Sequence, residues 1–197
     1  GRQGFINAVL RSFQRSGKVL VHDDIKRVQY SCEQWIIDLW TKAYGPEKAE
    51  EMLRVSNTPA PFTVRVNTLK TSREELAASL KAGGFSVRPS EVSKLCLIVS
   101  GRAGALDTEE YRQGLFSVQG EASAAAVELL APKAGETMLD LCAAPGGKSC
   151  CAAELMQGSG VVRAFDFYPH RVQLIEKEAS RLGLKTVLAQ AADSQVF

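Results

Sequence analysis

The sequence predicts an α/β chain that consists of N-terminal helices, a small α+β unit and the first half of a parallel, doubly wound sheet. Three observations support this fold class. Helical periodicity runs through most of residues 4–55. The Pro-rich segment 58–61 then separates these helices from a stretch in which strand and helix patterns mix. From residue 136 onward strand and helix patterns alternate, which is typical of parallel strands joined by right-handed crossovers.

The N-terminal region is predicted to contain three helices, over residues 4–15, 31–43 and 46–55. Gly17 follows the first helix, and Pro46 suits the first turn of the third. The first helix gathers its apolar side chains on one face: Phe5, Ile6, Val9, Leu10 and Phe13. Since nothing before this helix covers that face, we expect further structure upstream.

The α+β unit is predicted over residues 61–118. A strand at 62–67 precedes a helix at 71–82, which opens with a capping residue and two early acids. Two further strands are predicted at 85–88 and 95–99. Together these elements predict a compact unit that is distinct from the helices before it.

The third part, residues 119–197, begins with a helix that extends to residue 130. Its strands are predicted at 138–141, 161–165 and 186–189. The first strand runs into a loop of mostly small residues at the start of a helix: Cys142, Ala143, Ala144, Pro145, Gly146, Gly147 and Lys148. Asp166 follows the second strand, and Asp193 follows the third. Ligands of doubly wound sheets bind at the carboxyl ends of the strands, so we expect both acids at one pocket beside the loop.

This loop favours a nucleotide-type ligand. Small residues let a ligand approach the backbone, the helix start offers free N–H groups, and a carboxylate after the next strand can accept hydrogen bonds from ribose hydroxyls. The alternative is that the Gly-Gly turn serves only tight packing. The loop has neither the spaced glycines of the dinucleotide fingerprint nor the opening glycine of a P-loop, although Lys148 and Ser149 are adjacent.

Composition restricts the function classes. A net charge of +2 makes the chain only mildly basic, so any RNA site has to be a local patch. No apolar run is long enough to span a bilayer and no signal-peptide layout is present, which predicts no membrane partner. The five cysteines are irregularly spaced, which predicts reduced thiols in a cytoplasmic protein. Cys142, Cys150, Cys151, His22 and His170 lack metal-ligand spacing, so no metal is expected.

The segment Asp-Leu-Cys-Ala-Ala-Pro-Gly-Gly-Lys-Ser, residues 140–149, resembles the cofactor loop of RNA (cytosine-5-)methyltransferases. That family includes the bacterial small-subunit ribosomal RNA enzyme and the eukaryotic NOL1/NOP2/sun proteins. Four other segments resemble family motifs: 165–171 the second cofactor motif, 62–70 the Arg-Val-Asn-Thr strand, 114–123 the helix entry before the cofactor loop, and 4–11 the last helix of a NusB-like RNA-binding domain. The resemblance covers almost the whole chain.

The resemblance implies a division into four parts. Residues 1–17 would be the last helix of the NusB-like domain, 18–60 a helical linker, 61–118 an RRM-like RNA-binding unit, and 119–197 the N-terminal half of a Rossmann-like methyltransferase domain. It also implies an enzyme that methylates carbon 5 of cytosine in RNA, most simply small-subunit ribosomal RNA, with S-adenosyl-L-methionine as cofactor.

The resemblance also assigns roles to the loop and to the two acids. Cys142 to Lys148 would line the methionine and ribose of S-adenosylmethionine, Asp166 would bind the ribose hydroxyls, and Asp193 would lie near the adenine amine. Asp140 is expected to brace the loop rather than to touch the ligand. Lys148 would either pair with the cofactor carboxylate or remain solvated.

Residues for RNA binding are expected in the α+β unit, where Arg65, Asn67 and Lys70 would contribute to a basic face. A solvated surface of mixed charge is the alternative, because acidic residues are interleaved with the basic ones in this unit.

Cytosine methylation at carbon 5 needs a thiolate that adds to carbon 6, and a base that later removes the proton. In the family this cysteine lies beyond the third strand, and none of the five cysteines here has its Pro-Cys or Thr-Cys context. We therefore expect the nucleophile beyond Phe197, no methyl transfer by this chain alone, and an open edge at strand 138–141 where another chain could pair. The alternatives are a non-catalytic methyltransferase-fold protein that binds RNA or cofactor, and a nicotinamide-dependent dehydrogenase.

Overall fold

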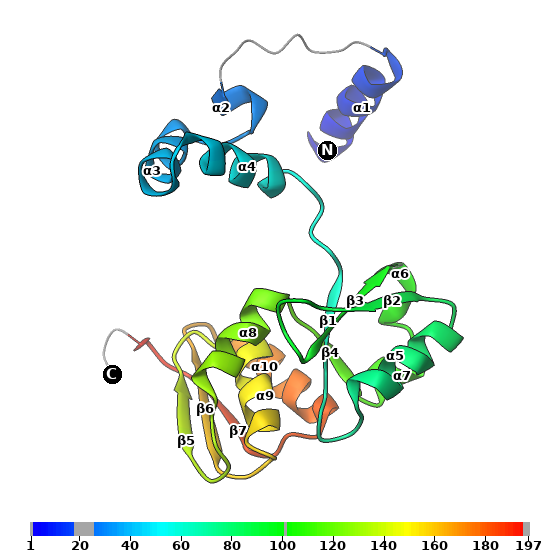
Figure 1. The fold of residues 1–197 in the computed structure, drawn as a ribbon, viewed down its shortest axis with the longest axis vertical. Coiled ribbons are helices and arrows are strands. Elements are labelled where there is room, and N and C mark those ends of the chain that lie inside the picture. Colours follow the sequence, from blue (N-terminus) through cyan, green and yellow to red (C-terminus); the bar gives the residue numbers. More distant parts are fainter. Residues whose placement is uncertain (1, 18–25, 101, 195–197) are drawn as a thin grey trace. The chain divides into compact units, whose positions relative to one another are not determined.

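The computed structural model describes residues 2–17, 26–100 and 102–194. The chain forms two compact units, Gly1–Ala60 and Pro61–Phe197 (Figure 1). The boundary between them falls in the Pro-rich segment. Part of the predicted helical linker, residues 18–25 with His22, lies outside the described residues.

The first unit is helical. Its elements are α1 (Arg2–Arg15), α2 (Lys26–Gln29), α3 (Gln34–Tyr44) and α4 (Pro46–Ser56), so the three predicted helices are confirmed and the one-turn helix α2 is additional. Tyr30, Ile37 and Leu53 form a small core, with Trp40 packed against it. The five apolar side chains of α1 are exposed.

The second unit begins with an antiparallel sheet in the order β2-β3-β1-β4. Its strands are β1 (Thr63–Val66), β2 (Ser86–Pro89), β3 (Cys96–Ser100) and β4 (Phe116–Val118), and its helices are α5 (Arg73–Ala82), α6 (Arg102–Ala105) and α7 (Glu109–Arg112). Helix α5 starts with a capping box in which the Ser72 hydroxyl accepts from the Glu75 N–H, and the Glu75 carboxylate accepts from the Ser72 N–H. Val64 and Val66 of β1 pack against Leu76 and Leu80 of α5.

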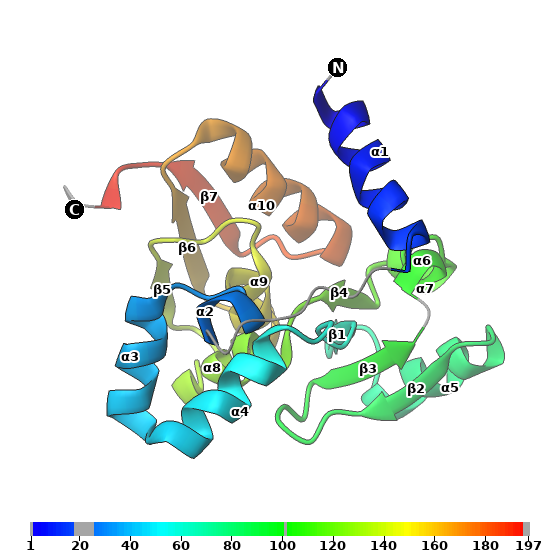
Figure 2. The same cartoon turned by 90° about the horizontal axis from the view of Figure 1, so that it is seen from above.

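A parallel sheet in the order β5-β6-β7 follows. Its strands are β5 (Thr137–Asp140), β6 (Val161–Asp166) and β7 (Val187–Ala191), and its helices are α8 (Glu121–Leu130), α9 (Gly147–Leu155) and α10 (Pro169–Leu182). The three helices lie on one face of the sheet (Figures 1 and 2). Residues of α9, among them Cys150, Cys151 and Ala152, form the core against Val162 of β6. The parallel alternation predicted from the sequence is therefore confirmed.

Strand β5 is an edge strand, as predicted. Within the described residues it pairs only with β6, and Leu139 and Leu141 are exposed beside that edge. In the described parts of the chain, none of the helices has the length and apolar character that crossing a membrane requires.

Candidate functional site

The loop between β5 and α9 is shaped by Gly146. This residue has φ +107°, and a Cβ atom here would lie 3.3 Å from Ile175 of α10. Glycine alone therefore suits both the left-handed backbone and the close approach. The Gly146 N–H donates to the Ala143 carbonyl (2.7 Å), and the Gly146 carbonyl accepts from the Cys150 N–H (2.8 Å), which turns the chain from the loop into the first turn of α9.

Asp140 braces this loop. Its side chain is buried, and it accepts from the Ser149 hydroxyl (2.8 Å) and from the Cys142 N–H (3.3 Å). The carboxylate thus ties the end of β5 to the start of α9. The bracing contacts expected for Asp140 from the sequence are present, and they occupy both of its oxygens.

Asp166 lies at the carboxyl end of β6, next to the loop. Its buried carboxylate accepts from the N–H groups of Ala144 (3.2 Å) and Tyr168 (3.4 Å), and it pairs with Arg171 (3.3 Å). The Arg171 guanidinium also reaches the Ala144 carbonyl (3.4 Å). The carboxylate is therefore held at the loop by two backbone N–H groups and one guanidinium.

Asp193 lies at the same end of the sheet. The Ala192 N–H donates to the Asp166 carbonyl (3.1 Å), which joins the chain after β7 to the end of β6, and Asp193 follows directly with a half-buried side chain. The edge beside the loop thus carries both acids. Their roles toward a ligand stay predictions.

The loop itself leaves space and hydrogen-bond donors for a ligand. Cys142, Pro145 and Lys148 are exposed, while Gly146 and Gly147 carry no side chain. The first N–H groups of a helix have no partner within the helix, so the start of α9 presents donors and the positive end of the helix dipole. A negatively charged or polar ligand group is favoured at this position.

The cysteines divide into buried and accessible thiols. Burial raises the pKa of Cys150 and of Cys151 to about 12, and burial also raises the pKa of Cys96. These three thiols stay protonated at neutral pH and are poor nucleophiles. Cys142 is exposed in the loop, and Cys32 is half-buried in the first unit. Among the described residues, no group of three or more His, Cys, Asp or Glu side chains is placed to hold a metal ion.

Arg65 and Asn67, predicted to bind RNA, are fully buried. Arg65 pairs with Glu154 of α9 (2.7 Å), and the Asn67 amide donates to the carbonyls of Gly114 (2.9 Å) and Leu182 (3.1 Å). The prediction is wrong for these two residues, because neither has surface that RNA can reach.

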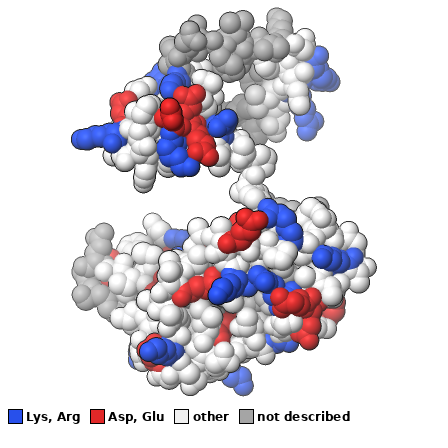
Figure 3. Space-filling model, in the orientation of Figure 1, with Lys and Arg blue, Asp and Glu red and all other residues white. Residues whose placement is uncertain are grey.

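Lys70 is exposed, but its ammonium group donates to the Gln113 carbonyl (2.7 Å) and reaches the Arg181 carbonyl (3.5 Å). All three residues therefore fasten the antiparallel sheet to the part of the chain that carries β5–β7. Figure 3 shows basic and acidic side chains interleaved over residues 61–197 on the visible face, as in the mixed-charge alternative.

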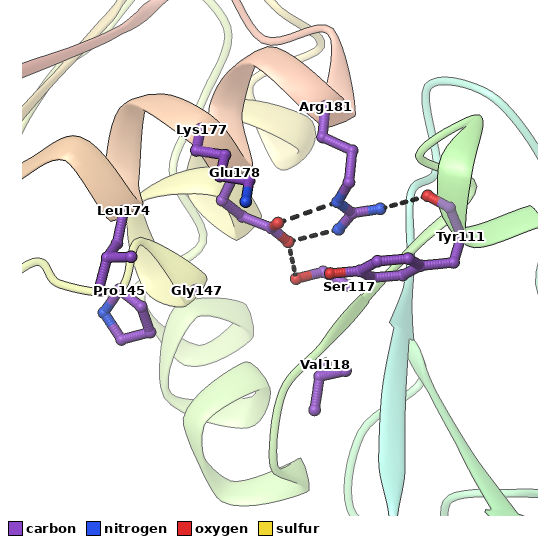
Figure 4. Close-up of a pocket in the computed structure, with 9 residues that line it drawn as sticks. All are labelled: Tyr111, Ser117, Val118, Pro145, Gly147, Leu174, Lys177, Glu178 and Arg181. Atoms are coloured by element: carbon purple, nitrogen blue, oxygen red, sulfur yellow. Dashed lines mark hydrogen bonds and ion pairs between the residues drawn. The ribbon is translucent and has the colours of Figure 1, made fainter. Parts of the chain in front are cut away.

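A cleft of about 460 Å³ adjoins the loop on the side of α10 and β4 (Figure 4). Its lining consists of Tyr111, Ser117, Val118, Pro145, Gly147, Leu174, Lys177, Glu178 and Arg181. Glu178 accepts from the Ser117 hydroxyl (2.6 Å) and pairs with Arg181 (2.5 Å), and Arg181 stacks over the Tyr111 ring at 3.9 Å. Neither Asp166 nor Asp193 lines this cleft. The cleft itself was not predicted from the sequence.

Two family descriptions match this chain. Residues 32–104 match "Methyltr_RsmF/B-like, ferredoxin-like domain", and residues 127–197 match "16S rRNA methyltransferase RsmB/F". The chain belongs to the RsmB/F methyltransferase family. The antiparallel sheet is accordingly its ferredoxin-like part, and β5–β7 belong to its Rossmann-like methyltransferase part.

Individual relatives agree. The chain is 38% identical to the probable ribosomal RNA small subunit methyltransferase B of Bacillus subtilis, over 99% of this chain and 44% of the relative. It is 33% identical to the human 28S rRNA (cytosine(4447)-C(5))-methyltransferase, over 86% of this chain and 21% of the relative. A methyltransferase homolog protein from Pyrococcus horikoshii superposes with a TM-score of 0.78 at 30% identity, covering 86% of this chain and 55% of that structure. The chain thus spans less than half the length of these two curated relatives.

Proposed function

We propose that this chain binds S-adenosyl-L-methionine at the edge formed by residues 142–148, Asp166 and Asp193, and that it belongs to an enzyme that methylates carbon 5 of cytosine in ribosomal RNA. The observation that carries the proposal is the Asp166 carboxylate, fixed against the loop by the Ala144 N–H at the carboxyl end of β6. The names of the bacterial relatives support small-subunit ribosomal RNA as the substrate class.

The residues of the edge fit the parts of this cofactor. The Gly146-Gly147 turn lets the ligand approach the backbone, and the N–H groups at the start of α9 suit the methionine carboxylate, with Lys148 adding positive charge. Asp166 accepts hydrogen bonds from the ribose hydroxyls, and Asp193 accepts one from the adenine amine. When bound, the cofactor supplies the methyl group, and the protein's part is to hold and orient it.

The chemistry at cytosine requires a thiolate, and none of the five cysteines is a good candidate. Cys96, Cys150 and Cys151 are buried with raised pKa values, Cys32 is half-buried among the helices of the first unit, and Cys142 belongs to the cofactor loop itself. We therefore assign cofactor binding, and not the nucleophile, to the residues of this chain. The same observation favours a second candidate, a methyltransferase-fold protein that binds cofactor or RNA without catalysis.

Lys70 remains the candidate RNA contact among the three predicted residues, since its side chain is exposed. If Lys70 contacts a phosphate, Lys70→Ala should reduce the magnitude of the slope of log RNA affinity against log salt concentration by about one. Filter binding across a salt series measures this slope. An unchanged slope assigns Lys70 only to the contacts with Gln113 and Arg181.

Calorimetric titration with S-adenosylmethionine tests the cofactor site. Asp166→Ala should weaken binding by about 1–3 kcal/mol, because a charged hydrogen-bond partner is lost. Asp107→Ala, at an exposed position of the ferredoxin-like part, is the matched control and should leave binding unchanged. Thermal unfolding of each variant checks that the fold is retained. Equal affinity of the wild type and the folded Asp166→Ala variant would remove Asp166 from the site.

A further inference from the structure

Arg65 makes an unusual set of contacts for a side chain without exposed surface. It lies on β1 of the antiparallel sheet, yet its guanidinium binds α9. Nε and Nη2 donate to the two carboxylate oxygens of Glu154 (3.1 and 2.7 Å), and Nη1 donates to the Gly147 carbonyl (2.9 Å) and to the Gln119 side-chain oxygen. One side chain thus contacts α9 near both of its ends.

Burying an ion pair is costly, and it is tolerated only where hydrogen bonds satisfy both ions. Burial raises the pKa of the Glu154 carboxyl, and the Arg65 guanidinium opposes that rise. Replacing a buried ion pair by apolar residues of similar volume is often neutral or stabilising, so joining the two parts of the chain does not by itself require the pair. The guanidinium adds directional hydrogen bonds, because its planar set of donors binds Glu154 and the Gly147 carbonyl at the same time.

Gly147 is the first residue of α9 and directly follows Gly146, the residue that shapes the loop. The hydrogen bond from Arg65 to the Gly147 carbonyl therefore sets the direction of the free N–H groups in the first turn of α9. We propose that Arg65 is a positioning residue for the cofactor loop, which couples the ferredoxin-like sheet to the binding of S-adenosylmethionine. This inference rests on the proposed function.

Asn67 provides an internal comparison. It is also fully buried at the same junction, but it holds the carbonyls of Gly114 and Leu182, at the end of α10, and not the start of α9. If the junction serves only general stability, loss of either residue should have similar effects on the loop. If Arg65 positions the loop, only its replacement should alter the loop.

The test compares Arg65→Lys with Asn67→Ala in the whole chain. Lysine keeps a positive charge beside Glu154 but cannot reproduce the fork. Hydrogen exchange is measured at the Ala143, Gly146 and Cys150 amides, whose hydrogen bonds hold the loop and the helix start. We expect Arg65→Lys to speed their exchange about tenfold and to weaken S-adenosylmethionine binding about tenfold, the effect of losing a hydrogen bond to a charged group. Asn67→Ala should change both within about twofold, although it lowers the melting temperature.

Equal effects of the two variants on the loop, or no effect of Arg65→Lys, overturn the inference. Should Arg65→Lys fail to fold, the Glu154→Gln variant takes its place, because losing the carboxylate charge weakens the contact that orients the Arg65 guanidinium. Unchanged hydrogen exchange of the loop amides in Glu154→Gln overturns the inference. The proposed function is tested separately. If the wild-type chain binds no S-adenosylmethionine, the proposed function fails, and the exchange rates still decide the role of Arg65.

Discussion

At the scale of single residues, the contrast between Asp140 and Arg65 shows what a sequence reveals. The bracing contacts of Asp140 follow from local chain order, because its partners Cys142 and Ser149 lie within nine residues. The partner of Arg65 is 89 residues away. Alternation along β1 places Arg65 on the face opposite Val64 and Val66, and that face packs against α9 of the parallel sheet instead of facing water. Burial of this face depends on the packing of two subdomains, which no local pattern encodes.

The buried thiols make a residue-scale prediction about pH. Cys150 and Cys151 have folded-state pKa values of about 12, above the ordinary thiol value, so their contribution to stability is complete below about pH 9 and is lost as the pH rises toward 12. Over that window each thiol should lower the free energy of unfolding by about 1.4 kcal/mol per pH unit.

Denaturant unfolding at several pH values between 8 and about 11 measures this slope. The double variant Cys150→Ala, Cys151→Ala should show a shallower alkaline slope than the wild type, even though its stability at neutral pH is lower. Parallel slopes in the two proteins would show that these thiols do not govern the alkaline transition.

At the scale of elements, long periodic segments were predicted well and short ones were missed. The helices α3, α4, α5 and α10 and the strands β5–β7 all carry their own hydrophobic pattern. Strand β4 has three residues, and its place is set by pairing with β1, where Val118 lies opposite Val64. The one-turn helix α7 likewise depends on its surroundings, since Tyr111 packs on Phe116. Elements this short lack a period of their own, so tertiary contacts determine them.

Gly114 marks a close approach between the turn before β4 and α10. It has φ +70°, and a Cβ atom there would lie 2.2 Å from the Arg181 carbonyl oxygen. Gly114→Ala should therefore lower the free energy of unfolding by about 2–5 kcal/mol, through backbone strain and overpacking together.

The matched control is Gly84→Ala. Gly84 also has a positive φ, +89°, but a Cβ there meets nothing within 4 Å, so only the backbone strain of about 1–2 kcal/mol applies. Chemical denaturation of the two variants gives the comparison. A Gly114→Ala variant as stable as Gly84→Ala would mean that the turn moves away from α10 at little cost.

At the scale of the whole molecule, the unit of residues 61–197 holds its two sheets together through polar contacts. Arg65 reaches the start of α9, Asn67 and Lys70 reach the end of α10, and Arg181 donates to the carbonyls of Tyr111 (2.7 Å) and Phe116 (3.0 Å). Contacts of this kind are directional, so they fix the orientation of the ferredoxin-like part on the methyltransferase part. The cofactor edge is thereby placed at a defined position relative to the antiparallel sheet.

The proposed S-adenosylmethionine site lies at the carboxyl edge of β5–β7. The most direct measurement is a backbone-amide NMR titration of the chain with this cofactor, in which the shifted amides locate the ligand. We expect the largest shifts on the amides of residues 142–149 other than Pro145, which has no N–H, on Asp166 and its neighbours, and around Asp193. Shifts concentrated instead on Tyr111, Ser117 and Leu174, which line the neighbouring cleft, or no shifts at saturating cofactor, would contradict it.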